Sequence, residues 1–409
     1  MDRRIISLIL LTFINVLGFS IMLSVFPFII DSFDGNAFTY GVLIASYSVA
    51  QLIATPILGS LGDKYGRKPI VRICQIVALI GWVVLALSYF IPVTMMISGI
   101  SLTLLIIIFS RILDGIAAGS FSVTNAYVSD ITKSHERTKA FGMLSAVFGI
   151  GYLVGPVIGA YTSSFTIGYL GSALVVLALS IGTAIFTWRY LSESLPKEKR
   201  IHDLEINVLH EINMFEKLMK FRPNSFIYKL FFVRIFHVFV FTAYITLIVL
   251  YMKDVYHVGL NSFGKYYLLL GFFVLINQIY LTKKSTEWFG ELTTYYIGTA
   301  AMFVGLVTVG FVDDLWIFLL NSYILIMGIS MSMVTFKSLI TMYTEDTRQG
   351  EVNGLDESIV AGTAAIAPLI FGYVYDQIFR FAFLFLAVIL VFPHIILWFR
   401  TKRLMIRHP

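Results

Sequence analysis

The chain has 409 residues, of which 58% are hydrophobic and 13% are charged. A water-soluble domain carries about 25% charged residues, so this composition excludes an ordinary soluble enzyme or binding module and predicts a membrane protein. The net charge of +6 does not indicate nucleic-acid binding, because the basic residues lie in short loops between apolar segments. The single cysteine, Cys74, excludes an internal disulfide.

Charge-free stretches in the first half predict six helices, since about 20 apolar residues cross a bilayer. The first stretch, residues 5–30, is longer than the apolar core of a cleaved signal peptide, so we expect it to be retained. Residues 35–62 predict the second helix. Residues 73–128 hold the third and fourth helices with a turn near Ile91–Pro92, and residues 140–188 hold the fifth and sixth with a break near Ser163–Ser164.

A polar segment at residues 192–225 separates this half from six further predicted helices. Its mixture of acidic, basic and apolar residues predicts at least one amphipathic helix lying on the membrane surface. The six helices are expected at residues 226–252, 263–282, 293–312, 315–342, 354–375 and 379–399. The predicted fold is an all-α membrane protein of twelve spanning helices, with domains at 1–191 and 226–409 joined by a cytoplasmic linker at 192–225.

The loop charges predict the orientation, because Lys and Arg collect on the cytoplasmic side of membrane proteins. One set of helix ends and the linker carry most of the basic residues, including Arg3, Arg4, Lys64, Arg67, Lys68, Arg72, Lys133, Arg137, Lys139, Lys283, Lys284, Arg348, Arg400, Lys402 and Arg403. The opposite ends carry Asp31, Asp34, Asp313, Asp314 and Asp376. Both termini are therefore expected in the cytoplasm, which requires an even number of spans.

The two halves contain similar dipeptides in the same order. Gly155–Pro156 lies 212 residues before Ala367–Pro368, and Tyr65–Gly66 after the second helix resembles Phe289–Gly290 after the eighth. Such matches predict a duplicated six-helix unit, as in transporters built from repeats.

The most specific motif lies in the loop after the second helix and reads Gly59-Ser-Leu-Gly-Asp63-Lys-Tyr-Gly66-Arg67-Lys68. Charge alone fits an ordinary cytoplasmic loop equally well. The full spacing resembles the signature loop of the major facilitator superfamily, and the whole chain is similar to that family's twelve-helix plan. The resemblance implies two pseudo-symmetric bundles that alternate access to a cavity near the middle of the bilayer.

Three further stretches resemble the twelve-helix drug:proton antiporters, which include tetracycline efflux pumps. They are Arg111-Ile-Leu-Asp114-Gly-Ile-Ala-Ala-Gly119 in the fourth helix, Gly151-Tyr-Leu-Val-Gly155-Pro156-Val-Ile-Gly159 in the fifth, and Leu191-Ser-Glu193-Ser after the sixth. Glycines four residues apart allow another helix to approach closely, and proline bends a helix. Simple close packing explains these glycines too; the resemblance implies a role in antiport.

The resemblance also implies roles for individual residues. Asp63 and Arg67 would interact with charge at the end of the fourth helix, here Asp130, and at the start of the eleventh, forming a latch that stabilises one access state. The latch set is Gly59, Asp63, Gly66, Arg67, Lys68 and Asp130. Arg111 would take part in proton coupling or in the response to substrate. Many relatives carry an acid where this chain has Asn15, so a proton-carrying role for the first helix is in doubt.

Charged residues inside the spans are candidates for function, since each costs about 2.5–3.5 kcal/mol to insert. Arg111 and Asp114 share one helix face, so they neutralise each other or serve in proton coupling. His237 is a further candidate, because imidazole ordinarily titrates near neutral pH. Asp356 and Glu357 begin the eleventh helix, where Lys337 is expected to pair with one of them, although solvated helix ends fit equally well.

Polar side chains near mid-span are candidates to line a substrate cavity, with packing hydrogen bonds as the alternative. Arg234 belongs to this group, although its side chain can also reach the membrane surface. The cavity candidates are Asn15, Asn125, Tyr127, Arg234, Asn277, Gln278, Asn321 and Lys337.

The sequence contains no phosphate-binding loop, no cysteine–histidine metal cluster and no nucleophile elbow. It therefore predicts neither an enzyme nor a bound cofactor or metal. The predicted function is proton-coupled efflux of a small amphipathic or drug-like compound across the plasma membrane, by a chain that works as a monomer. The alternatives are a uniporter or importer of a nutrient, siderophore or metabolite, and a non-transporting receptor on the same fold.

Overall fold

The computed structural model describes residues 3–33, 35–97, 99–132, 134–164, 167–201, 225–344 and 349–405. These residues are almost entirely helical, which confirms the predicted all-α class. The chain divides into two compact units, Met1–Ile212 with Gly259–Lys265, and Asn213–Val258 with Tyr266–Pro409. Each unit has a buried hydrophobic core of its own.

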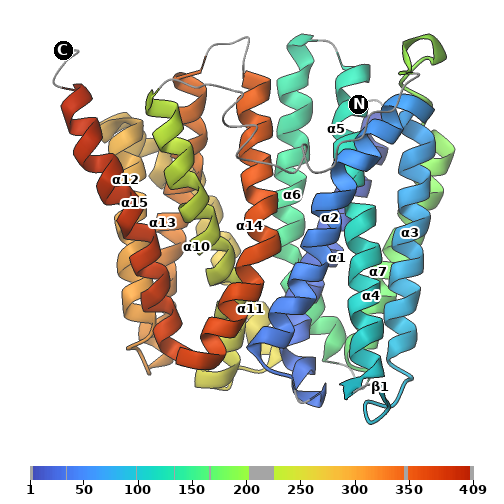
Figure 1. The fold of residues 1–409 in the computed structure, drawn as a ribbon, viewed down its shortest axis with the longest axis horizontal. Helices are drawn as coiled ribbons and strands as arrows, with labels where there is room; N and C mark the ends of the chain where they lie inside the picture. The colour runs from blue at the N-terminus through green and yellow to red at the C-terminus, as the bar shows by residue number, and fades with distance from the viewer. Residues whose placement is uncertain are drawn as a thin grey trace. The chain divides into compact units, whose positions relative to one another are not determined.

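Residues up to 201 form seven α-helices, two short 3₁₀ turns and a small hairpin. In chain order these are α1 (Arg3–Ile29), η1 (Ile30–Phe33), α2 (Ala37–Tyr65), α3 (Arg67–Ser88), β1 (Met96–Ile97), β2 (Ile100–Ser101), α4 (Leu102–Ala118), α5 (Ser120–Ile131), α6 (Ser134–Ser163), α7 (Tyr169–Tyr190) and η2 (Lys197–Lys199). Figure 1 shows the hairpin at the end of this unit opposite to the start of α1. The turn expected near Ile91–Pro92 is thus the connection from α3 through the hairpin to α4, and the break expected near Ser163–Ser164 separates α6 from α7.

The predicted fourth helix is divided into α4 and α5 at Gly119, although the two parts follow one line in Figure 1. A Cβ atom at Gly119 would lie 2.9 Å from the Cβ of Ala54 on α2. Glycine therefore permits close contact between these helices at the division.

Residues from 225 onward form six α-helices, a π-helical turn and a 3₁₀ turn. In chain order these are α10 (Ser225–Tyr256), α11 (Leu260–Ile276), the π-helix η3 (Asn277–Thr282), α12 (Lys283–Val309), α13 (Leu315–Met342), α14 (Gln349–Ile378), η5 (Phe379–Phe381) and α15 (Ala382–Met405). The bounds of α13 are those predicted. It begins at residue 315 because the Asp314 carboxylate accepts hydrogen bonds from the backbone N–H groups of Trp316 and Ile317, at 2.8 and 3.0 Å.

The two glycines that the sequence pairs between the halves have similar backbone conformations. Gly66 joins α2 to α3 with φ 102° and ψ 155°, and Gly290 kinks α12 with φ 77° and ψ 167°. Left-handed φ values of this kind favour glycine. The same turn therefore occurs at equivalent places in the two halves, as a duplicated unit predicts.

Within the described residues, nine helical stretches are long and apolar enough to cross a membrane. Two of them, Leu260–Val309 and Gly354–Ile395, contain 50 and 42 residues and each include more than one helical element. The count of twelve spans, the domain boundaries and the cytoplasmic termini stay predictions. The amphipathic helix predicted in the linker falls largely on residues 202–224, outside the described residues.

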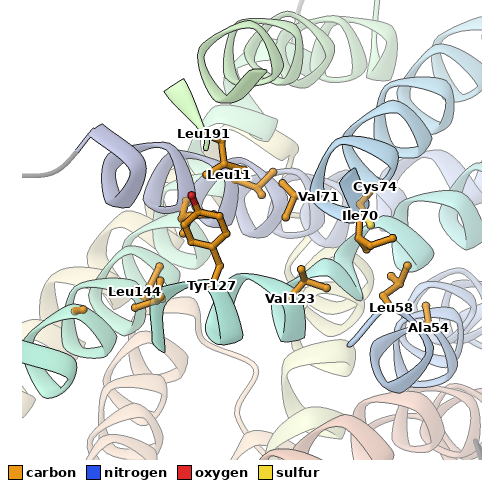
Figure 2. Close-up of a cluster of buried hydrophobic side chains, with 13 residues drawn as sticks. Leu11, Ala54, Leu58, Ile70, Val71, Cys74, Val123, Tyr127, Leu144 and Leu191 are labelled. Carbon is orange, nitrogen blue, oxygen red and sulfur yellow. The ribbon is translucent and has the colours of Figure 1, made fainter. Parts of the chain in front are cut away.

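A cluster of buried side chains holds the helices of the first unit together. It draws residues from α1, α2, α3, α5 and α6, together with Leu191 after α7. Figure 2 shows Tyr127 within this cluster, with its hydroxyl directed toward Leu191. That hydroxyl donates a hydrogen bond of 2.5 Å to the carbonyl of Ser192, so the core also fixes the end of α7.

Candidate functional site: a charged loop and buried ion pairs

The loop between α2 and α3 forms a compact charge network. The guanidinium of Arg67 lies 2.5 Å from the carboxylate of Asp63 and 3.4 Å from that of Asp130 at the end of α5. Arg67 is only 7% exposed. The structure thus brings together three residues of the predicted latch, one of them 63 positions away in the sequence.

The glycines of the motif make room for this network. A Cβ at Gly62 would lie 3.1 Å from Nη1 of Arg67, and Gly59 offers its carbonyl to the same nitrogen at 3.5 Å. A Cβ at Gly66 would lie 2.5 Å from the carboxylate of Glu193. Larger residues at Gly62 and Gly66 would therefore displace charged groups of the network.

Glu193 belongs to the same charge network and was not among the residues predicted for the latch. Its carboxylate accepts hydrogen bonds from the backbone N–H groups of Arg67 at 2.9 Å and Lys68 at 3.3 Å. It therefore caps the first turn of α3, where the helix dipole favours negative charge. The Leu191-Ser-Glu193-Ser stretch could have indicated this role, but it was interpreted only as part of the family resemblance.

The segment after α7 folds back on the latch. Nη2 of Arg200 lies 3.7 Å from the Glu193 carboxylate, and the N–H of Ile201 donates to the carbonyl of Asp63 at 3.2 Å. The hydroxyl of Ser194 donates to the Asp130 carboxylate at 2.9 Å. The beginning of the linker is therefore part of the same network.

Arg111 and Asp114 form an ion pair deep inside the first unit. Nη1 of Arg111 lies 3.0 Å from Oδ2 of Asp114, and the two residues are 1% and 4% exposed. The guanidinium lies over the rings of Trp82 on α3 and Phe26 on α1, at 4.9 and 5.6 Å from their centroids. Cation–π contacts of this kind stabilise a cation away from water.

Helix α6 packs against α1 through the three glycines of its motif. A Cβ at Gly151 would lie 3.3 Å from the carbonyl oxygen of Phe13, at Gly155 2.5 Å from the Cβ of Ser20, and at Gly159 2.8 Å from Oγ of Ser24. These contacts follow one line along α1, so the close approach expected from the glycine spacing is present.

In the second unit, Arg234 on α10 binds Asp356 on α14 through two hydrogen bonds. The Nε–Oδ1 distance is 2.7 Å and the Nη2–Oδ2 distance is 3.2 Å, with both side chains buried. Lys337 lies 3.8 Å from Glu357, but these side chains are 51% and 63% exposed. The two adjacent acids thus have different partners in very different surroundings.

His237 lies one turn after Arg234 on α10 and is buried. Its Nε2 lies 3.0 Å from the hydroxyl of Ser332 on α13, and its ring centroid is 5.7 Å from that of His394 on α15. His394, which was not among the residues predicted from the sequence, lies 2.7 Å from the hydroxyl of Tyr295 on α12. Side chains from four helices therefore form one buried polar group in this unit.

The other cavity candidates lie in different surroundings. Asn15 lines a small cavity in the first unit, and Asn125 is partly buried. Asn277 is buried and accepts a hydrogen bond from the Tyr323 hydroxyl at 3.4 Å, whereas Gln278 is exposed. Asn321 donates to the Gly305 carbonyl at 3.0 Å. Whether any of them contacts a substrate stays a prediction.

Long apolar helices with buried, paired charges define an integral, multi-pass membrane protein with the features of a transporter. The chain belongs to the Major Facilitator Superfamily, whose family model matches residues 8–340. It is therefore a transporter of small-molecule substrates and not an enzyme.

Among curated proteins, the chain is 26% identical to the class H tetracycline resistance protein of Pasteurella multocida, over 92% of this chain and 90% of that protein. It is also 26% identical to the quinolone resistance protein NorA of Staphylococcus aureus, over 92% and 91%. The fold resembles that of the human organic anion transporter MFSD10, with a TM-score of 0.70 at 18% identity over 97% of this chain and 99% of that chain. A bacterial homologue of the lysosomal transporter Spinster gives 0.72 at 15% identity over 97% and 96%.

Proposed function

We propose that this protein is a proton-coupled antiporter that exports a small amphipathic or drug-like compound by alternating access. The observation that carries the proposal is the buried Arg111–Asp114 pair, 3.0 Å apart inside an apolar bundle. Similarity over about nine-tenths of the chain to proteins named for tetracycline and quinolone resistance supports the substrate class.

The pair can couple proton binding to a conformational change, because protonation of Asp114 changes the net charge of the pair. With Asp114 ionised, the pair is neutral as a whole and tolerates burial. Protonation of Asp114 leaves the Arg111 cation without its counter-ion, and breaking a buried pair in this way costs about 3–5 kcal/mol. A conformation that hydrates Arg111 then becomes favoured, so proton binding shifts the population of access states.

The latch is the structural element on which this population shift acts. Arg67 contacts two carboxylates, and Glu193 ties the start of α3 to the end of α7. These contacts must loosen if α2, α3 and α7 move relative to one another. The network thereby stabilises the conformation that contains it and sets the cost of leaving it.

The proposal puts the latch and both termini on the cytoplasmic side of the plasma membrane, following the distribution of basic residues. A single chain carries both units, and we propose that one chain is the working transporter. Asp356 is the second acid to test, because it is buried with Arg234 in the same manner.

The test is substrate-driven proton movement in proteoliposomes that contain a pH indicator. Addition of tetracycline or a fluoroquinolone is expected to change the internal pH, and Asp114→Asn is expected to abolish the change. Asp313→Asn is the matched control, because Asp313 is an exposed aspartate paired with Arg380 outside the helices.

Three other results would contradict the proposal. Substrate flux without proton movement indicates a uniporter, and uptake in the same direction as protons indicates an importer. Binding without flux of any compound indicates a receptor. Proton movement that persists in Asp114→Asn but disappears in Asp356→Asn would show that the proton carrier is Asp356 in the second unit.

A further inference from the structure

A small cavity with a partly polar lining lies in the first unit, among α1, α3, α4, α5 and α7. Its polar lining comes from four of these helices, α1, α3, α5 and α7, and comprises Asn15, Cys74, Gln75, Ser120, Ser180 and Thr183. Apolar cavities stay dry, whereas a polar cavity large enough for a water holds one when two to four polar partners surround it. This lining has the chemistry of a water site.

Gln75 gives this cavity a donor of known orientation. Its Oε1 accepts a hydrogen bond of 3.0 Å from Nε1 of Trp188, and an indole N–H can only donate, so the amide cannot be turned around. The Nε2 group has no hydrogen-bond partner among the described residues, and Gln75 is only 5% exposed. A buried amide of this kind requires an acceptor, so Nε2 is a candidate donor to a water in the cavity.

Other buried polar side-chain atoms of the first unit also lack a hydrogen-bond partner. In the described part of the first unit, every such side-chain atom that has no ion pair either belongs to α3, α4 or α7: they are on Arg72, Gln75, Ser110, Arg111 and Thr187. On Arg111 they are Nε and Nη2, the two guanidinium nitrogens not used in the ion pair. Such atoms are therefore present both on Gln75, which lines the cavity, and on Arg111 of the buried pair.

The cavity lies between the latch and the Arg111–Asp114 pair along three helices. On α3, Gln75 and Ala78 follow Arg67 and precede Trp82, which contacts Arg111. On α4, Ala117 lines the cavity one turn after Asp114. On α1, Asn15 precedes Phe26, which also contacts Arg111. One helical turn rises about 5.4 Å, a distance that two consecutive hydrogen bonds can cover.

We propose that this cavity binds a water molecule held by Gln75, and that this water belongs to a proton path between the latch end of the first unit and Asp114. In each transfer the water accepts one proton from the latch side and gives one to the Asp114 side, so its composition is unchanged. The path rests on the proposed antiport function, whereas the water site does not. Asn15 thus acts as a polar partner of the water and not as a proton carrier.

Cys74 provides a probe for the water site, because it lines the cavity and is the only cysteine of the chain. Hydroxyl radicals generated by an X-ray pulse oxidise buried sulfur where bound water is in contact with it. The full-length protein in lipid nanodiscs is irradiated, and oxidation of Cys74 is measured by mass spectrometry. Met302, which is fully buried in α12, is the internal control for sulfur without water.

Cys74 is expected to be oxidised well above Met302. Gln75→Leu is expected to reduce this oxidation, and so is Thr183→Val, which keeps the side-chain shape and removes one hydroxyl. Unchanged protection of Met302 shows that a variant is folded. Oxidation of Cys74 no greater than that of Met302, or oxidation unchanged in both variants, overturns the water site.

The proton path is tested on the same variants in proteoliposomes. Gln75→Leu is expected to slow substrate-driven proton movement while substrate affinity is kept, because the proposed water carries protons and does not hold the substrate. Loss of Cys74 oxidation with undiminished proton movement overturns the path and leaves the water site. If the unmodified protein moves no protons, the proposed function fails, and the oxidation result alone then decides the water site.

Discussion

The hydroxyl of Ser20 on α1 donates a hydrogen bond of 2.6 Å to the backbone carbonyl of Tyr152 on α6. This carbonyl lies four residues before Pro156, which has no N–H to offer it. A carbonyl released by proline inside a membrane must find another donor. Ser20 is that donor, so the missing hydrogen bond at Pro156 in α6 is replaced by a contact with α1.

Ser20→Ala removes this donor and leaves the Tyr152 carbonyl buried without a partner. The expected loss of stability is about 1–3 kcal/mol, the cost of an unsatisfied buried polar group. Thermal unfolding of the purified protein measures it. Ser24→Ala is the control, because the Ser24 hydroxyl bonds to the Ile21 carbonyl within its own helix. Equal losses of stability in the two variants would show that the hydrogen bond to α6 contributes no more than one within α1.

Gly155→Ala tests the close approach of α6 and α1. The added Cβ would lie 2.5 Å from the Cβ of Ser20 and 3.0 Å from the backbone nitrogen of Ile21, so the helices must separate. Overpacking of this kind costs about 1–3 kcal/mol, and transport is expected to slow with it. Gly149→Ala on the same helix meets nothing within 4 Å and is expected to have little effect or to stabilise the helix. Similar transport rates in the two variants would exclude a role for the glycine contact.

Glu193→Gln tests the residue of the charge network that was not predicted for the latch. The carboxylate accepts from the N–H groups of Arg67, Lys68, Ser194 and Leu195, at distances of 2.9 to 3.3 Å. The glutamine amide keeps one acceptor oxygen, but it has an NH2 group, which donates, in place of the second oxygen. The latch is therefore expected to weaken by about 1.5–3 kcal/mol. The measurement is the rate at which Arg67 and its neighbours are cleaved by trypsin in detergent, which should rise.

The control for that experiment is Glu198→Gln, because Glu198 is an exposed acid in the 3₁₀ turn η2. It should leave cleavage at the latch unchanged. A latch that is equally protected in both variants would mean that Glu193 caps α3 without stabilising the conformation.

The sequence predicted elements whose cause is local. The bounds of α13 follow from the apolar run and from the Asp314 cap, both visible in the sequence. Gly66 and Gly290 were recognisable as equivalent because each follows an aromatic residue in a short charged segment after a predicted helix. The division of α4 from α5 at Gly119 was missed, because it depends on packing against Ala54 from a different helix.

The candidate site was predicted less completely, because its contacts join residues far apart in the chain. The i, i+3 spacing of Arg111 and Asp114 was sufficient to predict that they share a face. Nothing in the spacing indicated that Trp82 and Phe26 would lie against the guanidinium, nor that Glu193 would cap a helix 126 residues earlier. The partners of Asp356 and Glu357 likewise could not be predicted without the positions of α10 and α13.

Adjacent acids on α14 provide a final prediction, because their surroundings differ so strongly. Asp356→Asn removes the counter-ion of buried Arg234 and is expected to cost about 3–5 kcal/mol. Glu357→Gln breaks a pair with Lys337 that is more than half exposed, and such pairs contribute about 0.2–1 kcal/mol. Thermal unfolding of the two variants gives the comparison. If Glu357→Gln proves as damaging as Asp356→Asn, the exposed pair must be buried in another conformation of the transporter, and the latch would then extend to this helix.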